Sequence, residues 1–218
     1  MKHLTFYFDV ISPFAYLAFE RLPQALAGLS VSVSYRPILF AGLLAHWGQK
    51  GPAEIEPKRA WTFRHVAWQA HQAGIALESP AQHPFNPLAL LRLGVACAPE
   101  GGTPNRFICE QLFRHVWQGG ADANDAARLA SLAERLAPPR DPQSAEVKAA
   151  LKSATDAAIA KGVFGVPTFE ADGRLFWGVD AMTMLAASLR GDPWFDGPGW
   201  DARPTPLAGI VRSTIAPS

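Results

Sequence analysis

The sequence has few of the residues that build thiol or metal centres. Its 218 residues include two cysteines, Cys97 and Cys109, which form no Cys-x-x-Cys pair and lie near no histidine cluster. A redox pair and a zinc site are therefore both poorly supported, and we expect two buried free thiols. His65 and His71 are six residues apart, which does not match the i, i+4 spacing of two metal ligands on one helix face. We expect them on a helix surface and predict no metal site.

An excess of charge is missing too, and so are long apolar runs. Twenty basic and nineteen acidic residues give a formal net charge of +1, without the basic stripe that nucleic-acid binding requires. No apolar run approaches the ~20 residues that cross a bilayer, and the N-terminus has neither a basic region nor an Ala-x-Ala cleavage site. We therefore expect a cytoplasmic protein that binds a small molecule, with no nucleic acid or membrane partner.

Three common catalytic motifs are also missing. The sequence contains no Gly-x-Ser-x-Gly elbow, no P-loop and no Gly-x-Gly-x-x-Gly fingerprint. Hydrolase, phosphoryl-transfer and dinucleotide-dependent chemistry are thus left without a motif.

The first forty residues carry a strand-helix-strand pattern. Aromatic and β-favouring residues fill 4–10, apolar residues recur at helical spacing over 15–29, and residues 31–39 alternate as a strand does. Pro23 predicts a kink or an early end of the helix. A β-α-β unit of this length implies parallel strands joined by a right-handed crossover.

Ser12 and Pro13 stand where the first strand meets the helix. Serine is a favoured N-cap, and proline suits the first helical position because its missing N–H would have no partner there. The free N–H groups and the positive end of the helix dipole would favour an anion beside the Ser12 hydroxyl. Caps far outnumber anion sites, so Ser12 taken alone is better explained as a cap.

The middle of the chain changes to helices separated by Gly and Pro punctuation. Apolar periodicity predicts helices over 40–48, 57–74, 86–98, 104–118, 123–137 and 143–161. No strand pattern interrupts them, which indicates a helical insertion.

Strands return after the helical block. Residues 166–171, the turn Asp172-Gly173 and residues 175–178 predict a hairpin, because Asp-Gly between apolar runs is a strong hairpin signal. A helix over 180–189 follows, with Asp180 in its first turn. Residues 192–218 are rich in Pro, Gly and Trp without periodicity, which predicts an extended tail that packs through its aromatic side chains.

This order of elements is that of an α/β, thioredoxin-like fold with a large all-helical insertion. On that basis we expect a thioredoxin-like domain from residues 1–39 and 162–191, an inserted helical domain over 40–161 and the tail over 192–218. The segment 162–169 resembles the loop that carries a cis-proline facing the first helix in thioredoxin-like proteins, with Pro167 in that position.

Ser12-Pro13-Phe14-Ala15 stands where a disulfide oxidoreductase of this fold has Cys-x-x-Cys. Together with Phe8-Asp9 before it and the segment 176–180 near the end, this replacement resembles the 2-hydroxychromene-2-carboxylate isomerases and the kappa-class glutathione transferases of the DsbA-like family. The resemblance covers roughly residues 3–191. It implies glutathione as cosubstrate and a homodimer.

The resemblance implies a glutathione site built around Ser12. Ser12 would hydrogen-bond the glutathione sulfur and stabilise its thiolate, since a hydroxyl donor and a helix N-terminus favour the ionised form of a thiol. The backbone of Val166, next to a cis Pro167, would pair with the cysteinyl part of glutathione like an added strand.

The other end of glutathione would bind near the last helix. In the resemblance, Gly178, Val179 and Asp180 hold the γ-glutamyl end, with Asp180 facing its ammonium group. Family members often have a polar residue and then Asp-Arg where this chain has Val179-Asp180-Ala181. The backbone contacts survive this departure, whereas two polar side chains are missing.

The resemblance also implies a substrate pocket that includes part of the helical block. The matching residues are Trp47, Lys50, Lys58, Trp61, Asn86 and Trp177. The structural alternative for a lysine at a helix start is a solvated surface charge, and for Asn86 a turn that caps a helix. The tryptophans could equally serve packing.

The predicted function is a glutathione-dependent isomerase of the 2-hydroxychromene-2-carboxylate type, acting on a small aromatic acid. The thiolate would add to the conjugated double bond of the ring-opened keto acid, rotation would follow, and expulsion of the thiolate would restore the double bond. Two alternatives remain open: a kappa-like glutathione transferase, and a non-catalytic thioredoxin-like protein that holds a peptide strand against Pro167.

Overall fold

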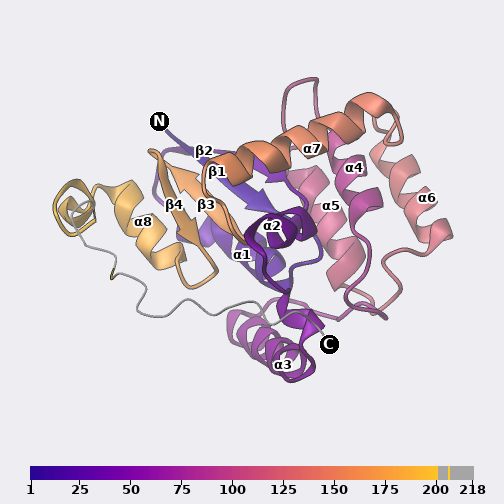
Figure 1. The fold of residues 1–218 in the computed structure, drawn as a ribbon, viewed down its shortest axis with the longest axis horizontal. Coiled ribbons are helices and arrows are strands. Elements are labelled where there is room, and N and C mark those ends of the chain that lie inside the picture. The colour runs from indigo at the N-terminus through magenta and orange to yellow at the C-terminus, as the bar shows by residue number, and fades with distance from the viewer. Residues whose placement is uncertain (201–205, 207–218) are drawn as a thin grey trace.

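A four-stranded mixed sheet forms the centre of the fold. In the computed structural model, which describes residues 1–200 and residue 206, the strands lie in the order β2-β1-β3-β4 (Figure 1). The strands are β1 (Lys2–Phe8), β2 (Val31–Pro37), β3 (Thr168–Ala171) and β4 (Arg174–Trp177). β1 pairs in parallel with β2, and β3 pairs antiparallel with β1 and β4. The predicted parallel pair and hairpin are both present.

The two parallel strands end earlier than the sequence predicts. β1 stops at Phe8 because the Asp9 carboxylate accepts the Ile11 N–H at 3.1 Å, which turns the chain away from the sheet. β2 stops at Pro37, and Ile38 still donates to the Phe8 carbonyl at 2.9 Å before the chain enters the next helix.

Helix α1 (Pro13–Ala25) joins β1 to β2, with Ser12 as its N-cap and Pro13 at its first position. It ends at Ala25 rather than at residue 29. The end falls two residues after Pro23, in line with the early end that this proline predicts.

Six helices separate β2 from β3. They are α2 (Phe40–Trp47), α3 (Glu56–Ala73), α4 (Leu88–Cys97), α5 (Arg106–Trp117), α6 (Ala126–Leu136) and α7 (Ala145–Ala160), with a 3-10 helix η1 (Pro52–Glu54) before α3. α4, α5 and α6 begin later than predicted because Asn86, Asn105 and Asp125 each accept a backbone N–H two or three residues on. Such a residue stands before a helix rather than inside it.

Helix α8 (Met182–Arg190) follows the hairpin, and Asp180 lies before it rather than in its first turn. The predicted position of Asp180 is therefore wrong: Met182 N donates to the Val179 carbonyl at 3.3 Å, so a turn precedes the helix.

The predicted tail begins with a 3-10 helix, η2 (Pro193–Asp196), and is not extended there. Phe195 and Trp200 pack on Phe176 of β4, with ring centroids 6.0 and 5.5 Å away. Aromatic packing of this segment is thus as predicted, while residues 201–205 and 207–218 lie outside the described part of the chain.

Two apolar cores lie on opposite faces of the sheet. Leu4, Phe6 and Phe8 belong to the larger core with α1, α5 and α8, whereas Tyr7 belongs to a smaller core with residues of α2 and α7. Successive side chains of a strand point to opposite faces, so β1 serves both cores. In Figure 1, α2 and α7 lie in front of the sheet and α1 behind it.

The two ends of the helical segment are joined by a hydrogen bond. The Thr155 hydroxyl on α7 accepts the Leu39 N–H at 3.0 Å and donates to the Leu151 carbonyl at 2.9 Å. The chain therefore leaves the sheet and returns to it at neighbouring points. A β-α-β unit and a β-β-α unit around one mixed sheet define a thioredoxin-like α/β fold, and the predicted fold class is confirmed.

Candidate active site

The turn between β1 and α1 places Ser12 against the loop before β3. Its Oγ accepts the Ala15 N–H at 3.2 Å, as an N-cap does, and donates to the Val166 carbonyl at 3.3 Å. The Val166-Pro167 bond is cis, as the resemblance implies. Residues 154 positions apart in the chain thus form one site, in which a nearly buried hydroxyl stands at a helix N-terminus.

The Asp9 side chain fixes this turn through two hydrogen bonds. It is fully buried, and its two carboxylate oxygens accept the N–H groups of Ile11 at 3.1 Å and of Phe40 at 2.9 Å. Burial raises the pKa of Asp9 from 3.8 to about 7, against the opposing effect of the two hydrogen bonds. One carboxyl group therefore joins the Ser12 turn to the first residue of α2.

Two further side chains hold the same turn. Trp117 Nε1 donates to the Val10 carbonyl and His83 Nε2 to the Ile11 carbonyl, both at 2.9 Å. The sequence did not indicate either role, because the partners lie 107 and 72 residues apart and no local pattern connects them.

The segment after β4 lies beside the cis-proline. Gly178 N donates to the Pro167 carbonyl at 2.9 Å, and Gly178 has a φ of 98°, which favours glycine. Val179 packs its side chain in the larger core, while Asp180 is exposed. The structure therefore brings this predicted segment next to Val166 and Pro167.

Three partly exposed aromatic side chains surround the cis-proline loop, and we call Trp47, Phe164 and Trp177 the aromatic rim. Trp47 Nε1 donates to the Val163 carbonyl at 3.0 Å, and the rings of Phe164 and Trp177 lie 4.9 Å apart. Trp47 and Trp177 were predicted as substrate contacts. Phe164 was not, although its place two residues before Val166 was a usable signal.

The remaining predicted substrate residues lie on the surface. Lys50, Lys58 and Trp61 are exposed, and within the described residues neither lysine has an ion pair. The His65 ring lies 6.2 Å from that of Trp61 and 5.8 Å from that of Phe14, which follows Ser12 by two residues. His65 is therefore half-buried rather than a free surface residue.

Asn86 is exposed and accepts the Leu88 N–H at 3.1 Å. The turn-forming alternative is thus present in the structure, and a substrate contact by this side chain stays a prediction.

Neither cysteine takes part in the site. Cys109 is buried and Cys97 half-buried, both are free, and burial raises the pKa of each thiol. Across residues 1–200 and 206, no group of His, Cys, Asp and Glu is arranged to hold a metal ion. The helices found there are all too short or too polar to span a membrane.

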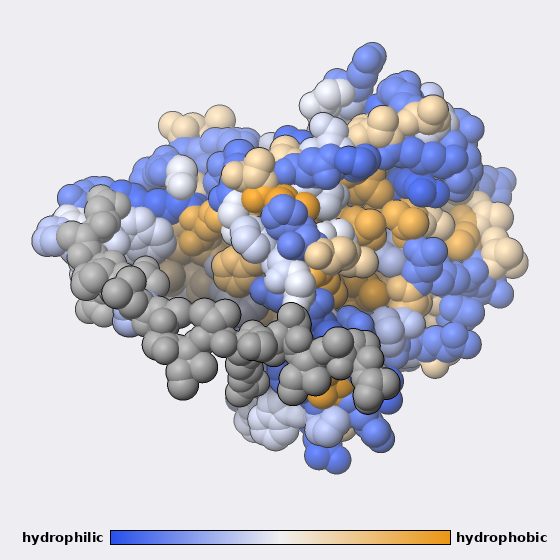
Figure 2. Space-filling view, viewed as in Figure 1, coloured by the Kyte–Doolittle hydropathy of each residue, from blue (hydrophilic) through white to orange (hydrophobic). Residues whose placement is uncertain are grey.

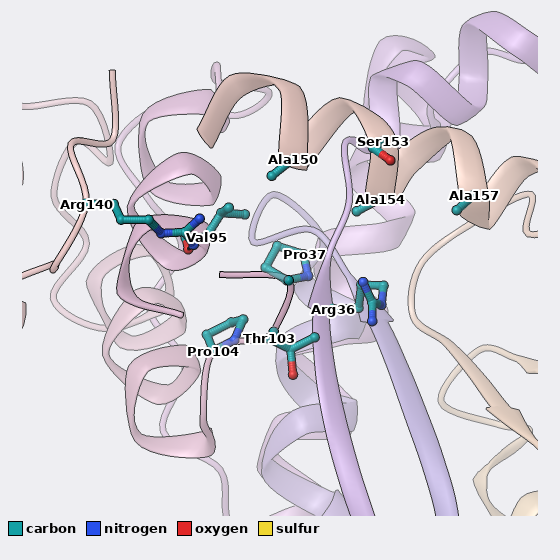
Figure 3. Close-up of a pocket in the computed structure, with 12 residues that line it drawn as sticks. Arg36, Pro37, Val95, Thr103, Pro104, Arg140, Ala150, Ser153, Ala154 and Ala157 are labelled. Atoms are coloured by element: carbon teal, nitrogen blue, oxygen red, sulfur yellow. Dashed lines mark hydrogen bonds between the residues drawn. The ribbon is translucent and has the colours of Figure 1, made fainter. Parts of the chain in front are cut away.

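A cavity of about 240 Å³ lies on another part of the molecule, between the end of β2, α4 and α7 (Figure 3). Arg36, Thr103, Arg140 and Ser153 supply its polar lining, and it contains none of the predicted site residues. Figure 2 shows hydrophilic residues along α7 and hydrophobic ones gathered beneath it, toward α4 and α5.

Taken together, these features define a thioredoxin-fold protein in which a serine, not a thiol pair, faces the cis-proline. A DsbA-like thioredoxin domain model matches residues 3–190, and the chain belongs to this family. The likeness to a solved 2-hydroxychromene-2-carboxylate isomerase has a TM-score of 0.75 at 24% identity and covers 89% of this chain and 97% of that one, which supports the fold.

The curated relatives divide between two kinds of enzyme. A 2-hydroxychromene-2-carboxylate isomerase of Sphingobium xenophagum is 29% identical over 86% of this chain and 98% of its own. Glutathione S-transferase kappa 1 of Rattus norvegicus is 26% identical over 88% of this chain and 92% of its own. These relatives support an enzyme of the DsbA-like family.

Proposed function

We propose that this protein is a glutathione-dependent isomerase of the 2-hydroxychromene-2-carboxylate type. The observation that carries this function is the hydrogen bond from Ser12 to the Val166 carbonyl, beside a cis-proline, in a chain whose two cysteines are free and form no pair. A hydroxyl in that place can serve a sulfur that arrives with a cosubstrate. Relatives named as this isomerase in Sphingobium xenophagum and Pseudomonas putida support the reaction.

Glutathione binding would exchange one hydrogen bond for two. The Ser12 hydroxyl turns from the Val166 carbonyl to the sulfur, and the released carbonyl accepts the N–H of the cysteinyl residue. A free thiol has a pKa of ~8.5 and is mostly protonated at neutral pH. The hydrogen bond from the Ser12 hydroxyl to the thiolate and the N-terminus of α1 both stabilise the ionised form, so they lower the thiol pKa and increase the thiolate fraction.

The γ-glutamyl end would lie along Gly178, Val179 and Asp180. Backbone groups before α8 contact its carboxylate, and the exposed Asp180 faces its ammonium group. Because Val179 is buried in the core, it contributes backbone atoms only.

In the reaction, the thiolate adds to the conjugated double bond of the keto acid, and the displaced electron pair moves to the carbonyl oxygen as an enolate. Rotation about the resulting single bond follows. Return of the pair then re-forms the double bond and breaks the C–S bond, which releases the thiolate. No proton or electron is consumed.

The aromatic rim would hold the substrate ring, with Trp61 and Asn86 at its edge. Lys50 or Lys58 would attract the substrate carboxylate and the developing enolate, since both are exposed cations. This assignment rests on the resemblance together with the position of the rim against residues 163 and 164 of the cis-proline loop.

Two measurements test the proposed function. Isothermal titration calorimetry should detect glutathione binding in the micromolar to millimolar range, and the protein should isomerise 2-hydroxychromene-2-carboxylate only when glutathione is present. Absence of binding at millimolar glutathione would favour the non-catalytic binding protein instead.

A kappa-like glutathione transferase is the second candidate, favoured by the kappa-class relatives. It uses the same thiolate but ends in a stable conjugate. Turnover of an aromatic halide with no turnover of the chromene acid would support it.

Gly165→Ala tests the aromatic rim. A Cβ at Gly165 would lie 2.5 Å from Trp177 Nε1, so the indole must move. We expect KM for the chromene acid to rise roughly fivefold, because a displaced aromatic contact loses about 1 kcal/mol, while the fold is retained. Gly197→Ala, where a Cβ would make an ordinary 3.7 Å contact, is the matched control. Equal KM values for both variants would remove Trp177 from the substrate site.

The same proposal extends to organisation. We propose a thioredoxin-like domain of residues 1–39 and 162–191 with residues 40–161 as an insertion, a homodimer, and a cytoplasmic location. Sedimentation velocity of the full chain measures the oligomeric state directly.

A further inference from the structure

The peptide groups of the turn before Ser12 are held by side chains from distant parts of the chain. Asp9 accepts the Ile11 N–H, Trp117 donates to the Val10 carbonyl, and His83 donates to the Ile11 carbonyl. Ser12 N itself donates to the Asp9 carbonyl at 3.1 Å. Two of these contacts hold the peptide group between Ile11 and Ser12: its N–H donates to the Asp9 carbonyl within the turn, and its carbonyl accepts from His83, the one side chain among these contacts that reaches this peptide.

His83 lies in the loop between α3 and α4 and packs among aromatic rings. Its ring centroid is 5.0 Å from that of Phe63 on α3, 6.1 Å from Phe85 and 5.9 Å from Trp117 on α5. These contacts fix the plane of the imidazole. The Nε2–H group of His83, which belongs to the helical segment, therefore points at the Ser12 turn.

The imidazole donates through Nε2. A carbonyl oxygen can only accept, so the bond to Ile11 requires the proton on Nε2. Nδ1 is buried and has no partner in the described residues, which suits an unprotonated nitrogen. Burial lowers the pKa of His83, and the nearby Arg59 lowers it further, against the hydrogen bond to Ile11, which raises it.

We propose that His83 is a positioning residue for the thiolate site: its hydrogen bond fixes the Ile11-Ser12 peptide and thereby directs the Ser12 hydroxyl toward the cis-proline loop, where the glutathione sulfur binds. This role rests on the proposed function. Without the donor, a half-buried carbonyl loses its partner and the peptide is held only by the bond from the Ser12 N–H to the Asp9 carbonyl, so the direction of the hydroxyl is fixed less firmly.

The test compares His83→Leu, which removes the donor, with His83→Gln, which keeps an N–H at similar reach. His71→Leu, on an exposed histidine of α3, is the control. For each variant the pKa of bound glutathione is read from thiolate absorbance, and hydrogen exchange of the Ser12 amide is measured without glutathione. We expect His83→Leu to raise the thiol pKa by about one unit and to speed exchange roughly tenfold, with both values restored in His83→Gln.

A lower melting temperature with unchanged thiol pKa and exchange would reduce His83 to a packing role and overturn the proposal. Faster exchange with an unchanged thiol pKa would also overturn it, because the turn would then not govern the thiolate. If the unmutated protein does not bind glutathione, the proposed function is wrong. Hydrogen exchange of the Ser12 amide in the wild type and in His83→Leu would then decide alone whether His83 holds the turn. Should His83→Leu not fold, His83→Asn, whose amide is too short for the same bond, takes its place.

Discussion

Ser12→Ala is expected to raise the pKa of bound glutathione by about one to two units and to lower isomerase turnover roughly 10- to 100-fold. A hydrogen bond to a charged group contributes about 1.5–3 kcal/mol, and the alanine variant loses it while the helix N-terminus of α1 remains. Thiolate absorbance of the complex and kcat for the chromene acid measure the two effects.

The same substitution removes the N-cap of α1, which costs about 1 kcal/mol of stability. Ser144→Ala provides the matched control, since Ser144 caps α7 through the Val147 N–H at the same 3.2 Å and lies outside the site. We expect both variants to lose similar stability and only Ser12→Ala to lose activity. If both keep full turnover and the same thiol pKa, Ser12 is a cap and nothing more.

Raising the pH from 5 to 8 is expected to destabilise the wild-type protein by about 3 kcal/mol more than it destabilises Asp9→Asn. Burial raises the pKa of Asp9 from 3.8 to about 7. Between these values the folded state keeps a proton that the unfolded state has released, so the free energy of unfolding falls as pH rises and levels off above 7. Two pH units at 1.36 kcal/mol each give the expected difference.

Urea unfolding at pH 5, 6, 7 and 8 measures this difference. Asp9→Asn also carries a pH-independent cost of about 1–3 kcal/mol, because an amide has one acceptor for the two N–H groups of Ile11 and Phe40. Asp192→Asn, on the exposed N-cap of η2 that accepts the Trp194 N–H, is the matched control for an aspartate-to-asparagine change away from Asp9. Parallel curves for wild type and Asp9→Asn would show that Asp9 is ionised throughout this range.

The helices were predictable because their signals are local. Apolar spacing located all six inserted helices. The predicted starts of α4, α5 and α6 were two or three residues too early, because a capping residue such as Asn86 cannot be told from a polar residue on the exposed face of a helix. The hairpin followed from Asp172-Gly173, where Asp172 and Gly173 both have positive φ.

The site was predictable only in part. The order of motifs predicts Ser12, Val166 and Pro167 as neighbours, since each belongs to a short recognisable segment, and the structure brings them together. The contacts that hold Ser12 in place were not predictable, because a buried carboxylate at Asp9 and an imidazole at His83 acquire their roles from partners brought close by the fold. The Phe8-Asp9 motif can be read from the sequence, whereas the two N–H groups that its aspartate accepts are visible only in the structure.

The hydrogen bond between Thr155 and Leu39 joins the two ends of the helical segment, so this segment leaves the sheet and returns to it at nearly the same point. Because the cost of closing a chain segment grows slowly with its length, residues between these points can change in number while β2 and β3 keep their places. The change in length is limited, because Phe40, His83 and Trp117 lie inside this segment and contact the turn that carries Ser12. The segment between Leu39 and Thr155 can therefore vary elsewhere, provided that these three residues still reach the turn that carries Ser12.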